Sequence, residues 1–157
     1  MNVYVDPYRR SDLPRGGVLT IGNFDGVHLA HQEMLRRVVG RARDLDAPAV
    51  VLTFEPHPTK VLHPQRAPKM IQTLRQREEA IADLGVDALV VVPFTREFAA
   101  LPPEEFVKDL LWRRLGAEDW QGDRSVLTAI LMHLAGLYSG PLKGPVRARA
   151  FSNLMST

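Results

Sequence analysis

Two histidines, His28 and His31, lie three residues apart directly after a loop that is bounded by Gly22 and Gly26. On a helix, this spacing places both imidazoles on one face. The glycines let the backbone turn sharply and approach a ligand closely, and the free N–H groups at a helix N-terminus attract phosphate. Two imidazoles beside such a site would donate hydrogen bonds to phosphate oxygens, more strongly when they are protonated. The pattern predicts phosphate chemistry at this loop.

The same residues have two other interpretations. A His-x-x-His pair on a helix is often surface decoration or packing that binds no ligand. His28, His31 and Asp25 are also suitable zinc ligands, which would make the chain a metal-dependent hydrolase. The loop lies between a predicted strand and a predicted helix, and open parallel sheets bind ligands at the carboxyl ends of their strands. This position favours the phosphate interpretation.

The elements that must position this loop alternate between strands and helices. Short apolar runs predict strands at residues 3–5, 18–21, 49–54 and 86–92. Helical spacing of apolar residues predicts one helix that starts near residue 27 and others over residues 73–84 and 104–115. Four prolines within residues 55–68 predict a loop or an extended segment there. This alternation predicts an α/β fold, a doubly wound parallel sheet with right-handed crossovers.

Terminal residues delimit the last two of these helices. Thr73 is a suitable N-cap because its side-chain oxygen can accept a hydrogen bond from a free N–H group of the first turn. Gly85 and Gly116 are suited to the left-handed conformation that often follows the last turn of a helix.

The sequence pattern changes near Trp120. No strand signal follows, although an alternating fold would continue with one. Residues 126–138 have helical spacing, and the glycines and prolines after them interrupt regular structure. The sequence therefore predicts a core over residues 1–120 and an atypical tail over residues 121–157, with one helix and then irregular structure. The sheet is expected to be incomplete at the C-terminus.

Composition restricts the classes of protein to which the chain can belong. Its 157 residues are enough for one domain with a core. The absence of cysteine excludes disulfides and Cys-ligated zinc and fits a reducing compartment, so we expect a cytoplasmic protein. No apolar run is long enough to span a bilayer, so we expect no membrane partner. The net charge is +2 with its basic excess in the tail, which predicts no nucleic-acid partner. These features do not predict the oligomeric state.

Three separated segments carry a family resemblance. They read LTIGNFDGVHLAHQEML, VVLTFEPHPTKVLHP and ADLGVDALVVVPFTREFAALPPEEFVKDLL. Together they resemble the nucleotidyltransferase (FAD synthetase) domain of the prokaryotic bifunctional riboflavin kinase/FMN adenylyltransferase family, over residues 15–118. The resemblance implies a Rossmann-like nucleotidyltransferase fold, in agreement with the alternating elements.

The resemblance also implies which residues act. His28 and His31 match the two histidines that hold ATP phosphates and stabilise charge on the transferring group, so they are the expected catalytic residues. The expected ATP-binding residues are Gly22, Asn23, Phe24, Asp25, Gly26, His28 and His31. The expected flavin-binding residues are Thr53, Phe54, Pro56, His57 and Pro58. An aromatic ring and proline faces suit a flat isoalloxazine, and a few polar groups would orient it.

The reaction that the resemblance implies is the transfer of AMP from ATP to FMN, which gives FAD and pyrophosphate. ATP and FMN are then the expected substrates, and Mg²⁺ is expected to accompany ATP, with ligands that the sequence does not identify. No side chain needs to act as a nucleophile. Catalysis would consist of positioning and electrostatic stabilisation.

The sequence departs from the family pattern in two places. Ala30 replaces the glycine between the two histidines. Beyond residue 118, neither the Gly-x-Asp-x-x-Phe-Gly segment nor the Ser/Thr-rich motif that ends in arginine follows, and no riboflavin kinase module is expected. These departures leave two alternatives: a catalytically incomplete domain that binds ATP or flavin, and another His-x-Gly-His adenylyltransferase that acts on pantetheine phosphate or nicotinate mononucleotide. Residues 53–58 favour FMN over the latter two substrates.

Overall fold

The computed structural model describes residues 1–102 and 105–116. The chain divides into two units, Met1–Trp120 and Gln121–Thr157, and all the described residues belong to the first. The helix predicted over residues 126–138 and the irregular segment after it lie outside the described residues. No helix within the described ranges is long and apolar enough to cross a bilayer.

Four parallel strands form one sheet in the order β1-β4-β3-β2. They are β1 (Asn2–Val5), β2 (Val18–Ile21), β3 (Ala49–Glu55) and β4 (Ala88–Pro93). The two central strands, β3 and β4, are buried at every residue except the last one of each. This matches their continuously apolar sequences, since parallel strands are usually covered on both faces. Each strand lies within two residues of its predicted position.

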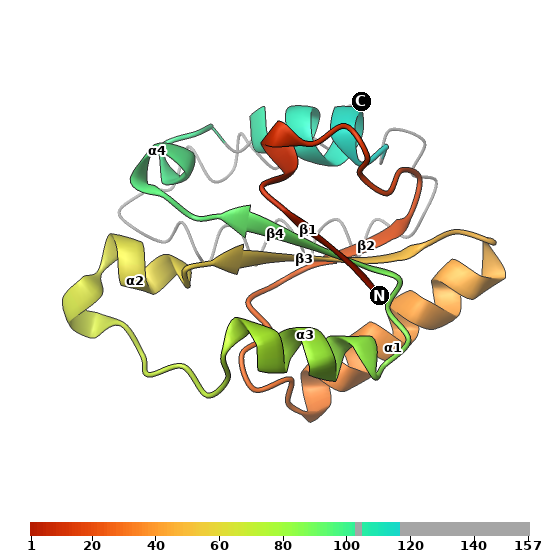
Figure 1. The fold of residues 1–157 in the computed structure, drawn as a ribbon, viewed down its shortest axis with the longest axis horizontal. Helices are drawn as coiled ribbons and strands as arrows, with labels where there is room; N and C mark the ends of the chain where they lie inside the picture. The colour runs from red at the N-terminus through yellow and green to blue at the C-terminus, as the bar shows by residue number, and fades with distance from the viewer. Residues whose placement is uncertain (103–104, 117–157) are drawn as a thin grey trace, which may run out of the picture. The chain divides into compact units, whose positions relative to one another are not determined.

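Helices cover both faces of this sheet (Figure 1). On one face lie α1 (Leu29–Asp44) and α3 (Leu74–Ala82), and on the other lie η1 (Pro7–Arg9) and η3 (Phe106–Arg114). The first face is sealed by a buried apolar cluster that consists of Phe24, Val27, Leu35, Val51, Ile81, Val86, Leu89 and Val91. The predicted α/β architecture with a doubly wound parallel sheet is therefore confirmed for this part of the chain.

The proline-rich segment after β3 is more regular than its sequence predicts. The prediction of a loop or extended segment over residues 55–68 is wrong, because α2 (Pro58–Leu62) and the 3₁₀ helix η2 (Pro64–Arg66) lie there. Pro58 and Pro64 each open one of these short helices. Proline costs no hydrogen bond at that position, since the first N–H groups of a helix have no intrahelical acceptor.

Three other helices differ from their predicted bounds, and α3 ends at Ala82 instead of residue 84. α1 begins at Leu29, because Val27 adopts a left-handed conformation with φ of 37°. The last helix, predicted over residues 104–115, is the π-helix η3. The short helix α4 (Arg96–Ala99) precedes it and was not predicted; its first turn is capped by the Thr95 side chain, which accepts from the Phe98 N–H at 3.0 Å.

Candidate functional site

The loop between β2 and α1 is shaped by left-handed backbone. Phe24, Gly26 and Val27 have φ values of 53°, 79° and 37°. A positive φ is unfavourable for phenylalanine and valine, but both side chains are buried in the cluster beneath α1 and α3. The core thus holds the loop in a conformation that its local sequence disfavours.

The two glycines of the loop allow close contacts with its neighbours. A Cβ atom at Gly22 would lie 3.1 Å from the Phe24 ring. At Gly26, a Cβ atom would lie 3.1 Å from Cδ1 of Ile71, and the positive φ would strain any other residue. Gly26 is therefore required by its left-handed backbone, whereas a side chain at Gly22 would displace the Phe24 ring by a few tenths of an ångström.

The imidazoles of His28 and His31 stack, with ring centroids 3.6 Å apart and an interplanar angle of 24°. His28 precedes the helix as its N-cap residue, and His31 lies in the first turn. The His28 side chain is exposed and does not cap the helix. His31 is half-buried, with the Phe24 ring 5.2 Å away. The spacing argument thus predicted the side-by-side arrangement, although only one of the two residues is helical.

Asp25 ties this loop to the segment before α3. Its carboxylate accepts hydrogen bonds from the backbone N–H groups of Ile71 and Gln72, each at 3.0 Å. Burial by itself would raise the pKa of Asp25, but these two hydrogen bonds and the positive charge of Arg77 outweigh burial, and the pKa is lowered. Asp25 is therefore ionised at neutral pH and its oxygens serve the fold.

The alternative of a zinc site at His28, His31 and Asp25 receives no support. Within residues 1–102 and 105–116, no group of three or more potential metal-ligating side chains is present. The Asp25 oxygens that such a site would need are turned to backbone N–H groups instead.

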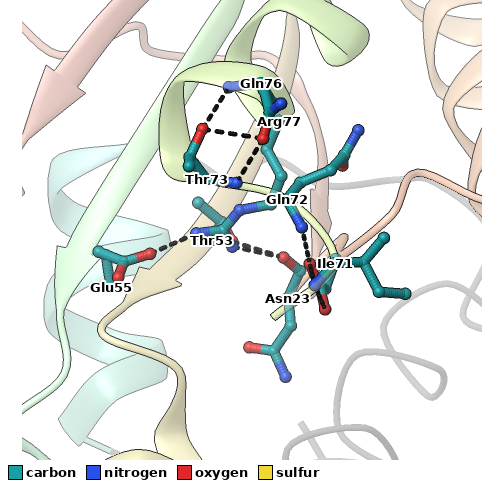
Figure 2. A network of polar contacts seen from close by, with 9 residues as sticks. Asn23, Thr53, Glu55, Ile71, Gln72, Thr73, Gln76 and Arg77 are labelled. Carbon is teal, nitrogen blue, oxygen red and sulfur yellow. Dashed lines mark hydrogen bonds and ion pairs between the residues drawn. The ribbon is translucent and has the colours of Figure 1, made fainter. Parts of the chain in front are cut away.

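The backbone carbonyl of Asn23 accepts hydrogen bonds from one residue of β3 and one of α3 (Figure 2). The carbonyl oxygen accepts from Thr53 Oγ1 at 3.3 Å and from Arg77 Nη1 at 2.7 Å. Arg77 is only 1% exposed, and its guanidinium also forms an ion pair with Glu55 at the end of β3. Arg77 and Glu55 are thus in contact with the candidate site, and neither was among the predicted residues.

A signal for Arg77 was present in the sequence. Arg77 lies three residues after Leu74 and four before Ile81, so it occupies the apolar stripe of the helix. Arginine is almost never fully buried unless it is paired. A charged residue on the buried face of a helix next to a ligand-binding edge therefore points to a specific partner, although the partner itself cannot be read from the pattern.

The predicted flavin-binding residues are divided between two environments. Thr53 and Phe54 are each 1% exposed. Thr53 faces Asn23, whereas the Phe54 ring packs against Phe94 and Phe98, with centroids 5.6 and 5.9 Å apart. Successive strand residues point to opposite faces, so the sheet separates these two side chains.

The remaining three predicted flavin residues form the entry to α2. Pro56 is exposed, His57 is half-buried and Pro58 is buried. His57 Nδ1 accepts from the Thr59 N–H at 3.2 Å and so caps α2. Burial lowers the pKa of His57, and the nearby charge of Arg77 lowers it further against the opposing effect of Asp25. His57 is therefore neutral at physiological pH, with Nε2 carrying the proton.

Comparisons with known proteins show which family the chain resembles. The profile of the family described as FAD synthetase matches residues 10–120. The bifunctional riboflavin kinase/FMN adenylyltransferase of Escherichia coli (strain K12) is 41% identical over 106 residues, which are 67% of this chain and 34% of that protein. The protein of the same name from Pseudomonas fluorescens is 40% identical over 104 residues, which are 66% of this chain and 33% of that protein.

A solved structure also resembles this chain. It is described as the crystal structure of a macrolide-efflux protein from Streptococcus pneumoniae, and it matches with a TM-score of 0.59 and 29% sequence identity, over 69% of this chain and 38% of that one. The chain spans about a third of the length of the curated relatives that it matches. The family profile nevertheless covers most of its residues, including the whole loop from Gly22 to His31. The chain therefore belongs to the FAD synthetase family.

Proposed function

We propose that this chain is an FMN adenylyltransferase that transfers AMP from ATP to FMN and releases pyrophosphate. The stacked pair of His28 and His31 at the start of α1, in a chain of the FAD synthetase family, is the observation that carries the proposal. In the reaction, an oxygen of the FMN phosphate forms a bond to the α-phosphorus of ATP. The bond from that phosphorus to the pyrophosphate oxygen breaks, and no protein atom forms a covalent intermediate.

The ATP phosphates would lie at the N-terminus of α1. The His28 side chain does not cap this helix, so its imidazole does not occupy the space in front of the first turn. The N–H groups of that turn and the positive end of the helix dipole favour an anion. The two imidazoles would donate hydrogen bonds to phosphate oxygens as negative charge develops on the transferring group, which stabilises the transition state. The other predicted nucleotide-loop residues, Gly22, Asn23, Phe24, Asp25 and Gly26, would shape the backbone that receives ATP.

The flavin would lie beside the segment that follows β3. Pro56 offers an exposed apolar face, and neutral His57 offers an Nε2–H donor for a polar edge of the isoalloxazine. Thr53, Phe54 and Pro58 are buried, so they would fix the position of this segment. Mg²⁺ would arrive with ATP as part of that substrate, since this ion is usually bound through substrate phosphates.

The test is a titration of FMN fluorescence with the chain, with and without Mg-ATP, and an analysis of the same samples for FAD and pyrophosphate. We expect saturable quenching and stoichiometric FAD and pyrophosphate. Quenching without FAD would instead support a catalytically incomplete binding domain. An absence of quenching by folded protein would contradict the flavin assignment and favour another adenylyltransferase substrate.

The two histidines provide the sharper test. We expect His28→Ala and His31→Ala each to lower kcat about 100-fold, which is the usual effect of removing one preorganised donor from a transition state. Arg41→Ala is the control, because Arg41 is exposed in the last turn of the same helix. Turnover in a histidine variant equal to that of the control would show that the imidazole removed in that variant does not act on the transferring group.

A further inference from the structure

Arg77 is a buried arginine whose guanidinium reaches two different segments of the candidate site. It donates to the Asn23 carbonyl oxygen at 2.7 Å and pairs with the Glu55 carboxylate. The Arg77 side chain is 2% exposed, and that of Glu55 is 35% exposed. Burying a guanidinium costs stability unless every contact is well formed, and apolar replacements of such pairs are often neutral or stabilising. Packing alone therefore does not explain why an arginine occupies this position.

The two segments that Arg77 joins are the ones that would bind the two substrates. Asn23 lies in the loop after β2, directly before the residues that lead to the histidine pair. Glu55 is the last residue of the neighbouring strand β3 and is bonded to Pro56, where the proposed flavin segment begins. Figure 2 shows Asn23, Glu55 and Arg77 in one network with Thr53. One guanidinium thus spans the carboxyl ends of two adjacent strands.

The helix that carries Arg77 is itself anchored beside the loop. At the start of α3, Thr73 Oγ1 accepts from the Gln76 N–H at 3.2 Å, and Gln76 Oε1 accepts from the Thr73 N–H at 2.9 Å. The preceding residues, Ile71 and Gln72, donate to Asp25 in the loop. Arg77 therefore projects from a first turn whose position relative to the loop is already held by other bonds.

We propose that Arg77 is a positioning residue that sets the nucleotide loop relative to the flavin segment, so that the affinities for both ATP and FMN depend on it. The proposal rests on the proposed function for the identity of the two ligands. A lysine could not replace the arginine, because its compact ammonium group lacks the planar fork that serves two acceptors in different directions. The Nε atom of Arg77 has no acceptor among the described residues, so the side chain is oriented by its two terminal contacts.

The test has two parts: the amide exchange rate of the nucleotide loop, and the dissociation constants for FMN and Mg-ATP. In Arg77→Lys, we expect the amides of residues 22–26 to exchange with deuterium about tenfold faster than in the wild type, because local opening of the loop becomes easier. We expect the dissociation constants for FMN and for Mg-ATP both to rise about tenfold, because each affinity falls with the population of the binding-competent arrangement. Arg75→Lys is the matched control, since Arg75 lies on the same helix, is 86% exposed and pairs with Glu79. It should stay within about twofold of the wild type on all three measurements.

A second variant separates the contact of Arg77 with Asn23 from its contact with Glu55. Glu55→Gln keeps the Arg77 bond to Asn23 and weakens only the pairing at the flavin side. We expect it to raise the dissociation constant for FMN several-fold and to leave that for Mg-ATP within about twofold. This variant also decides the matter if Arg77→Lys does not fold.

Three results would overturn the positioning role. Loop exchange in Arg77→Lys equal to that in Arg75→Lys would do so, as would faster exchange with unchanged affinities for both ligands. An unchanged FMN affinity in Glu55→Gln would show that the pair of Arg77 and Glu55 does not position the flavin segment. If the wild type binds neither FMN nor Mg-ATP, the proposed function fails. The amide exchange of the loop then decides by itself whether Arg77 holds it.

Discussion

Ala30 lies between the two stacked histidines, in the first turn of α1, with its methyl group exposed. The family pattern has glycine at this position. Glycine is needed where φ is positive or where another group approaches the backbone closely. Ala30 is an ordinary helical residue with a negative φ, so the backbone here does not require glycine. The methyl group would matter only through a bound nucleotide.

At the residue scale, we therefore predict that Ala30→Gly is neutral for catalysis. The variant should lower the free energy of unfolding by about 1 kcal/mol, because glycine is a poorer helix former than alanine. The KM for ATP should stay within about twofold of the wild type, since an exposed methyl blocks no backbone contact. Steady-state kinetics and urea denaturation measure the two effects.

Arg41→Gly is the control for Ala30→Gly. It places glycine at an exposed position in the last turn of the same helix, at the opposite end from the histidines. Both variants should be destabilised to a similar extent. A KM for ATP that falls more than about tenfold in Ala30→Gly alone would show that the methyl group crowds the nucleotide and impairs this chain.

At the scale of elements, the start of α3 determines how the site is assembled. Thr73 is the N-cap, as predicted, and it forms a complete capping box with Gln76. The same turn carries Arg77 and follows the residues that bind Asp25. The cap of this helix therefore supports both the helix and the nucleotide loop.

We predict that Thr73→Ala lowers the free energy of unfolding by about 1 kcal/mol, because one N–H group of the first turn loses its acceptor. Thr73→Ser keeps the side-chain oxygen and should stay within about 0.3 kcal/mol of the wild type. Urea denaturation followed by circular dichroism measures both. Equal stabilities of the alanine and serine variants would mean that the capping bond does not contribute.

At the scale of the whole molecule, two carboxylates connect parts of the chain that are distant in sequence. Asp25 holds the N–H groups of Ile71 and Gln72. Asp87 pairs with Arg43 at 2.8 Å and accepts from the Ala49 N–H at 2.8 Å. The hydrogen bond from Arg43 is the main cause of the lowered pKa of Asp87. Both contacts require the ionised carboxylate.

The pH dependence of stability follows from these two groups. Their folded-state pKa values lie below the ordinary value of 3.8, so they stabilise the fold above that pH. This stabilisation is lost as the pH falls through the folded-state pKa values. We predict that the melting temperature decreases steeply below about pH 4.

Asp25→Asn and Asp87→Asn test this origin of the acid sensitivity. Each should melt at a lower temperature than the wild type at pH 7 and should show a shallower decrease in acid. Asp44→Asn is the control, because Asp44 is exposed at the end of α1 and should leave the pH profile unchanged. An acid transition in Asp25→Asn and Asp87→Asn as steep as that of the wild type would assign the sensitivity to other groups.

The order of strands and helices and the place of the nucleotide loop could be predicted from the sequence. Both depend on interactions between near neighbours: apolar periodicity, glycine at turns, and the Thr73 cap. The histidine pair was predictable for the same reason, since its two members lie within one turn. The short helices α2 and η2 were missed because prolines that usually break helices open these two.

Only the tertiary structure decided which side chains from distant parts of the sequence come into contact. Arg77 lies 54 residues from Asn23, and no local pattern could identify that carbonyl as its partner. The Phe54 ring packs against Phe94 and Phe98, because successive side chains of β3 point to opposite faces of the sheet and Thr53 takes the other face. Sequence patterns report the conformation of neighbouring residues, whereas burial and long-range pairing depend on which elements pack together.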